Sequence, residues 1–166
     1  MQTMTNDRAK RPIDPFGKAG ARALLVDDPA LPGAARDDQF VSMLRGFRLS
    51  GGLARGHDLA TLLAGRARLD IGTLARWIVG GEVVHFDWQR ETWFPMFQFC
   101  GSDLAPRAAV SRVLMELRDV LDPWETAQWF ARPSTALANR SPADALDLDP
   151  DLVLHAARCD RYIVDA

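Results

Sequence analysis

Three helices are predicted in the middle of the chain, because apolar residues recur there every three or four positions. The first begins after an aspartate cap, Asp37 or Asp38, carries Phe40, Leu44 and Phe47 on one side, and ends at the following glycine pair. Two further helices follow, over about 56–64 and 71–79. A segment with alternating arginines, 65–70, separates these two and predicts a long turn between them.

A β-hairpin is predicted next, since β-branched and aromatic residues dominate 83–88 and 92–94. The segment 95–99 leaves this hairpin and is expected to be extended. The C-terminal part is predicted to be helical, with an amphipathic helix over about 106–121. Three later helix starts have an N-cap residue followed by proline: Asp122-Pro123, Ser141-Pro142 and Asp149-Pro150.

These patterns predict a mainly α-helical protein with three regions. Residues 1–38 are rich in proline and glycine and are expected to form a flexible arm. Residues 39–101 contain the two short helices and hairpin of a degenerate winged helix-turn-helix. Residues 102–166 are expected to form a small helical domain.

Charge and cysteine content narrow the classes of partner. The formal net charge is −2, which argues against a general nucleic-acid coat or a polybasic membrane anchor. Residues 47–90 have six arginines against four acidic residues, whereas residues 91–166 have seven arginines against twelve acidic residues. A mildly basic middle region therefore precedes an acidic C-terminal region.

Two cysteines, Cys100 and Cys159, are too few for a disulfide framework, so we expect reduced, partly buried thiols in a cytoplasmic protein. No apolar run is long enough to span a bilayer, so no membrane partner is expected.

No catalytic motif is present in the sequence. His155 and Cys159 are four residues apart and share a predicted helix face, but a zinc site needs about four ligands, and no others stand at a motif spacing. No nucleophile elbow, phosphate loop or dinucleotide fingerprint occurs. We therefore expect no enzymatic activity, no metal and no cofactor.

Two segments carry a resemblance to a known family. The first contains Leu59-Ala60, then Gly81 and Val83-Val84, then Phe94-Pro95-Met96-Phe97-Gln98-Phe99. The second runs from Trp124 through Trp129 and Pro133 to Leu137-Ala138-Asn139-Arg140-Ser141-Pro142 and Leu146. Together they cover roughly 47–162, and their order resembles the Xre/MbcA/ParS antitoxins, including the toxin-binding domain of that family.

The resemblance implies that the chain is an antitoxin that sterically blocks a RES-type, NAD-degrading toxin. It places the partner-binding residues in the C-terminal region: Trp129, Asn139, Arg140, Arg158, Arg161 and Tyr162. The alternatives from the residues alone are that both Trp124 and Trp129 are core residues and that Asn139 serves a left-handed turn. Because the two tryptophans are five residues apart, we expect one to face inward and the other to lie nearer the surface.

The same resemblance implies a homodimer and contact with operator DNA by the middle region. The candidate DNA-binding residues are Arg66, Arg68, Thr73 and Arg76. The turn over 65–70 is about four residues longer than the turn in the family, and this insertion alters the angle of the second helix. The alternative interpretation is therefore that these arginines are ordinary solvated surface residues. The alternative function is a stand-alone helix-turn-helix transcription regulator without a toxin partner.

Overall fold

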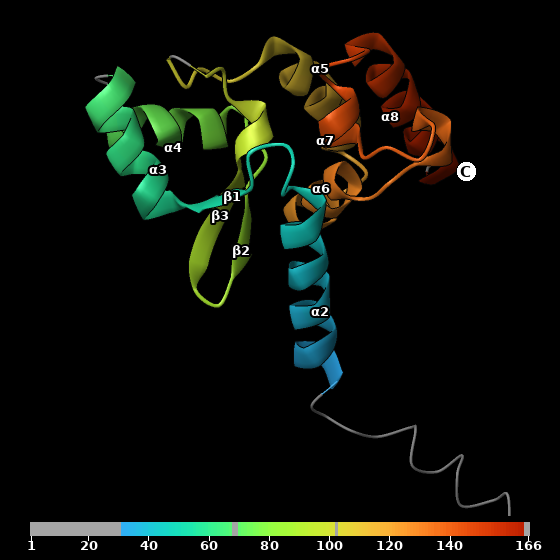
Figure 1. The fold of residues 1–166 in the computed structure, drawn as a ribbon, viewed down its shortest axis with the longest axis horizontal. Helices are drawn as coiled ribbons and strands as arrows, with labels where there is room; N and C mark the ends of the chain where they lie inside the picture. The colour runs from blue at the N-terminus through green and yellow to red at the C-terminus, as the bar shows by residue number, and fades with distance from the viewer. Residues whose placement is uncertain (1–30, 68–69, 102, 165–166) are drawn as a thin grey trace, which may run out of the picture. The chain divides into compact units, whose positions relative to one another are not determined.

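The computed structural model describes residues 31–67, 70–101 and 103–164 (Figure 1). The chain divides into two units, residues 1–35 and 36–166. Most of the predicted arm, up to residue 30, lies outside the described residues. The second unit is mainly helical with a small antiparallel sheet, which confirms the predicted fold class at this level.

Seven α-helices occur in the described residues. Their bounds are α2 Leu31–Gly46, α3 Gly56–Leu62, α4 Ile71–Val79, α5 Ala108–Leu117, α6 Pro123–Ala131, α7 Pro142–Ala145 and α8 Pro150–Val164. The first of them begins at Leu31, earlier than the cap expected at Asp37 or Asp38, whereas the predicted bounds of α4 agree with the structure. A π-helical turn, Leu63–Ala67, extends α3 into the segment that was predicted as a long turn.

The sheet has three antiparallel strands in the order β1-β3-β2. The predicted hairpin is formed by β2 (Phe86–Trp88) and β3 (Glu91–Pro95), and Trp88 pairs with Glu91. Its two turn residues, Gln89 and Arg90, both have positive φ, of 51° and 65°, which suits the right-handed twist of the strands. The third strand, β1 (Leu53–Arg55), was not predicted, because three residues are too few to show an alternating pattern.

Local capping chemistry starts the C-terminal helices as predicted. Asp122 and Glu125 form a reciprocal capping box at α6. The Ser141 hydroxyl accepts a hydrogen bond from Asp144 N–H at 3.2 Å, and the Asp149 carboxylate accepts one from Leu152 N–H at 2.9 Å. Each cap satisfies a backbone N–H that has no partner within its helix.

Two apolar clusters form the interior of the second unit. The larger combines side chains from α2, the hairpin and α5 to α8, such as Phe130, with side chains just after these helices, such as Phe47 and Leu146. The smaller combines side chains from α3, α4 and the sheet. Because the larger cluster draws on both the middle and the C-terminal region, the C-terminal helices pack on residues well outside 102–166.

The Pro-x-Phe-Gln-Phe segment, residues 95–99, contributes side chains to both clusters. Phe97 lies in the larger cluster and Phe99 in the smaller one. In an extended strand the two side chains would point to the same side. The structure instead forms a 3-10 helix, Met96–Gln98, so the prediction of an extended segment was wrong for 96–98, whereas Pro95 and Phe99 are extended. Between the two phenylalanines, Gln98 is fully buried.

Two further expectations concern the surface. Cys100 and Cys159 are free, as expected, but both are exposed, so the expected partial burial was wrong. Within the described ranges, every helix falls short of the length and apolarity that crossing a membrane requires.

Candidate partner-binding surface

The two tryptophans of α6 have different environments, as the five-residue spacing predicted. Trp124 is buried, and its indole N–H donates to the side-chain oxygen of Gln39 on α2 at 2.9 Å. Trp129 is partly exposed, and its indole N–H donates to the Asp160 carboxylate on α8 at 2.7 Å. Trp124 therefore ties α6 to α2, and Trp129 ties α6 to α8.

The loop after α6 is compact and presents Asn139 and Arg140 to solvent. A 3-10 helix, Thr135–Leu137, buries Leu137 in the larger cluster. The loop is closed by the Ser134 N–H, which donates to the Arg140 carbonyl at 3.0 Å. Asn139 has a φ of 61°, which confirms the left-handed conformation predicted for it, and Ala138 before it has a φ of 55°. The exposed pair therefore stands on a well-fixed backbone.

Two hollows meet at this part of the surface. The first, of about 630 Å³, lies between α2, the end of α6 and the loop, and both Asn139 and Arg140 line it. The second, of about 550 Å³, is lined by Trp129 and Asp160. Gln128, Arg132 and Pro133 line both hollows. Three of the predicted partner-binding residues, Trp129, Asn139 and Arg140, thus line one or other of these adjacent hollows.

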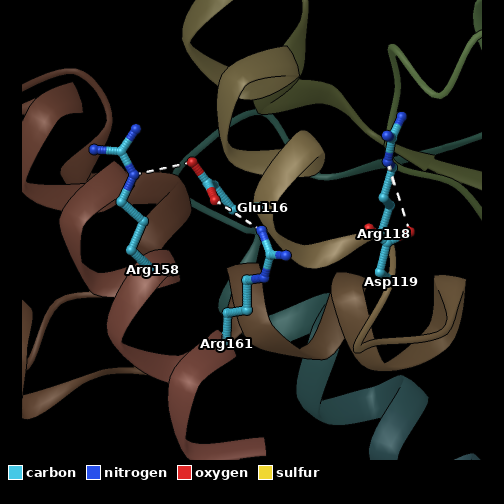
Figure 2. A network of polar contacts seen from close by, with 5 residues as sticks. All are labelled: Glu116, Arg118, Asp119, Arg158 and Arg161. Carbon is cyan, nitrogen blue, oxygen red and sulfur yellow. Dashed lines mark hydrogen bonds and ion pairs between the residues drawn. The ribbon is translucent and has the colours of Figure 1, made fainter. Parts of the chain in front are cut away.

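The other three predicted residues lie on α8 and line neither hollow. Glu116 on α5 accepts hydrogen bonds from Arg158 at 2.9 Å and from Arg161 at 3.3 Å (Figure 2). Tyr162, next along the helix, is 75% exposed. This cluster fixes two guanidinium groups on one side of α8, while Asp160 holds the helix to Trp129.

The contacts of Glu116 determine its ionisation. Its hydrogen bond from Arg158 lowers the pKa of the carboxyl, partial desolvation opposes that effect, and the charges of both arginines lower the pKa further. A carboxyl whose pKa is lowered by folding stabilises the native state above the ordinary pKa, and this contribution disappears as the pH falls through the folded-state value. The Glu116 cluster is therefore weakened in acid.

Glu116→Gln should reduce the acid sensitivity of the protein. The variant keeps an acceptor for one arginine but loses the charge, so its free energy of unfolding should fall less steeply between pH 7 and pH 3 than that of the native chain. Urea unfolding at several pH values measures this. Asp119→Asn is the control, because the only ion pair of Asp119 in the described structure is with its exposed neighbour Arg118, at 3.7 Å (Figure 2). Equal pH slopes for native chain and Glu116→Gln would contradict the assignment.

The candidate DNA-binding residues lie around the start of α4. Asp70 caps this helix, and the Thr73 hydroxyl donates to its carboxylate at 2.9 Å. Arg76 in turn donates to the Thr73 hydroxyl at 2.7 Å. The Thr73 hydrogen bonds lower the pKa of the Asp70 carboxyl. Thr73 is buried while Arg66 and Arg76 are exposed, and Arg68 lies outside the described residues.

Sequence reasoning missed the residues of the first hollow that come from other parts of the chain. Arg45 on α2 and Gln128 on α6 are more than eighty positions apart, and both line it. No motif joins them, and only the packing of α2 on α6 brings them together. His155 and Cys159 approach to 3.7 Å on α8, but no group of three or more metal-ligating side chains occurs in the described part of the chain.

Comparisons with known proteins add no family to this description. No protein-family model, no curated protein and no solved structure matches the sequence or the fold.

Proposed function

We propose that this chain is an antitoxin-like binding protein whose C-terminal region covers the active cleft of a RES-type, NAD-degrading toxin. The mechanism is steric, so it requires an exposed, rigid surface on the chain and no catalytic group. The proposal rests on the resemblance of 124–146 and of the Pro-x-Phe-Gln-Phe segment to the antitoxin family.

The structural observation that carries the proposal is the loop after α6. Asn139 and Arg140 are exposed, and the backbone beneath them is closed by the Ser134 hydrogen bond and anchored by the buried Leu137. A pre-organised loop loses little conformational entropy when a partner binds. Arginine and tryptophan are also among the residue types enriched in binding hot spots; Arg140 belongs to this loop, and the partly exposed Trp129 lines the adjacent hollow.

The α8 residues complete this surface. Glu116 holds Arg158 and Arg161 in place, so their guanidinium groups need little reordering in a complex. Exposed Tyr162 supplies a large amphipathic side chain beside them. In this proposal the α6 loop and the end of α8 contact the toxin together.

We expect the full chain to co-purify with a RES-domain protein encoded by the neighbouring gene. Arg140→Ala should weaken the complex by about thirtyfold, since a hot-spot arginine contributes about 2 kcal/mol. Arg118→Ala is the control, because Arg118 is equally charged, 70% exposed and, among the described residues, paired with Asp119 alone. Co-expression followed by affinity purification and a binding titration gives the result. Failure of the native chain to bind would count against the proposed partner.

A second candidate function, DNA binding by the middle region, is favoured by the network at α4. Asp70, Thr73 and Arg76 form a hydrogen-bonded chain that orients the Arg76 guanidinium at the first two turns of the helix. With α3 before it and the β2–β3 hairpin after it, α4 is the proposed recognition helix of a winged helix-turn-helix. Arg66, Arg68 and Arg76 are then the proposed phosphate contacts, and Thr73 orients Arg76.

DNA binding predicts a specific salt dependence. Removing one phosphate-binding side chain lowers the slope of log K against log salt by roughly 0.9. Arg66→Ala and Arg76→Ala should each reduce the slope by about that amount in titrations with the chain's own upstream promoter, whereas Arg118→Ala should not. If neither Arg66→Ala nor Arg76→Ala changes the slope, these two arginines are ordinary surface charges and do not contact phosphates.

A further inference from the structure

The first hollow has the properties of a peptide-binding groove, and we call it the α2–α6 groove. Apolar groups of Met43, Gly46, Ala131 and Pro133 contribute to its lining, and Leu49 at its edge is 82% exposed. Its volume of about 630 Å³ lies in the range of specific binding sites. An extended segment with an apolar side chain fits such a depression.

The two helical walls of the groove are held together at both ends. Near one end, the Trp124 indole donates to Gln39 across the helices. Near the other, α2 approaches α6 so closely at Gly46 that a Cβ there would lie 2.5 Å from the Ala131 carbonyl oxygen. The groove therefore exists before any partner arrives, and binding does not have to open it.

One polar atom at the groove has no hydrogen-bond partner among the described residues. Gln128 is only 9% exposed, and its amide nitrogen is buried without a hydrogen bond in the described structure. Gln128 lines both hollows, so this residue lies in the wall that they share. A buried amide that lacks a hydrogen bond destabilises the free protein, so an acceptor supplied by a ligand is favoured. The last torsion of glutamine is broad, so the amide can turn toward an acceptor in the groove at little cost.

The charges of the groove have the opposite sign to those of the whole chain. Three arginines, Arg45, Arg132 and Arg140, line it, against two aspartates, Asp38 and Asp144, which leaves one excess positive charge. The guanidinium groups of these three arginines make no ion pair with any described residue. The chain as a whole has a net charge of −2. An unpaired amide donor and unpaired guanidinium groups together select a carboxylate.

We propose that the α2–α6 groove binds an extended segment of the partner protein through an aspartate or glutamate side chain. The carboxylate accepts a hydrogen bond from the Gln128 amide and pairs with the arginines at the rim, while a neighbouring apolar side chain fills the lining near Met43 and Pro133. The inference rests on the proposed function, because Asn139 and Arg140 serve both, and it adds the chemistry of the segment that is recognised.

Short peptides test this chemistry without the toxin. The probe is acetyl-Gly-Leu-Glu-Leu-Gly-amide, and its twins carry glutamine or lysine in place of glutamate. In ¹H–¹⁵N spectra of the full chain, the glutamate peptide should shift the side-chain amide signals of Gln128. The glutamine twin should bind about tenfold more weakly, and the lysine twin should leave these signals unchanged. Equal shifts with all three peptides, or shifts confined to other residues, would overturn the proposal.

Two substitutions separate binding from folding. Gln128→Met removes the unsatisfied amide, so the urea midpoint should stay the same or rise while affinity for the glutamate peptide falls about tenfold. Arg45→Met should also weaken binding, whereas Arg48→Met, three residues along the chain and outside the groove lining, should not. Native affinity in Gln128→Met would overturn the inference. If the chain binds the glutamate peptide but not the toxin, only the proposed function is contradicted. If it binds the toxin but not the peptide, only the proposed role of the α2–α6 groove is contradicted.

Discussion

Replacing Gln98 by alanine is expected to lower the free energy of unfolding by at least about 3 kcal/mol, since each buried polar group left unpaired costs about 1–3 kcal/mol. The Gln98 side chain is completely buried. Its oxygen accepts from Val84 N–H, and its amide nitrogen donates to the carbonyls of Val84 and Pro95, each at 2.8 Å. The substitution leaves all three backbone groups without these partners, in the segment that joins the two apolar clusters.

Gln98→Met separates the hydrogen bonds from the packing. Methionine has nearly the same length as glutamine and fills the site. Destabilisation that both variants show therefore comes from the unpaired backbone groups, and the additional destabilisation of the alanine variant comes from the cavity. Urea unfolding, followed by tryptophan fluorescence and by circular dichroism, measures both variants. A methionine variant as stable as the native chain would show that the Gln98 hydrogen bonds contribute nothing to stability.

Leu146→Ala is expected to lower the free energy of unfolding by about 2–5 kcal/mol, because it removes buried volume and leaves a cavity. Leu146 follows α7 directly, is 1% exposed and belongs to the larger apolar cluster. Ser141→Ala at the other end of α7 should cost only about 1 kcal/mol, the usual effect of removing an N-cap. Its hydroxyl accepts the Asp144 N–H, and the substitution removes no apolar volume of comparable size.

The order of these two effects is the test, and urea unfolding of both variants under the same conditions provides it. Leu148→Ala is the matched control for the leucine, since Leu148 lies two residues further on and is 63% exposed. A leucine-to-alanine change there should alter stability by less than about 0.5 kcal/mol. A nearly neutral Leu146→Ala would contradict the packing of α7 and would make Leu146 part of an interaction surface.

Local chemistry made much of the helical structure predictable. The caps at Asp122, Ser141 and Asp149 act through hydrogen bonds that span three residues, so their pattern is visible in the sequence. The same is true of the left-handed Asn139, because asparagine tolerates that conformation well. The hairpin was also visible, since its strands are aromatic and β-branched.

Features that depend on distant contacts were not predictable. The backbone at Gln89 and Arg90 takes positive φ although neither residue favours it, because the flanking strands pair. The 3-10 helix at 96–98 places Phe97 and Phe99 in different clusters, whose other members come from distant parts of the chain. The α2–α6 groove was hidden for the same reason, since Arg45, Gln128 and Arg140 meet only through the packing of α2 on α6.

The most direct test of the proposed function is the rate of NAD consumption by the proposed partner, a purified RES-domain protein sought in the neighbouring gene. That rate is measured while the full chain is added in increasing amounts, with the Arg140→Ala and Arg118→Ala variants in parallel. We expect the native chain and Arg118→Ala to abolish NAD consumption near stoichiometric amounts, and Arg140→Ala to need at least about tenfold more protein. A rate unchanged by a large excess of the native chain would contradict it.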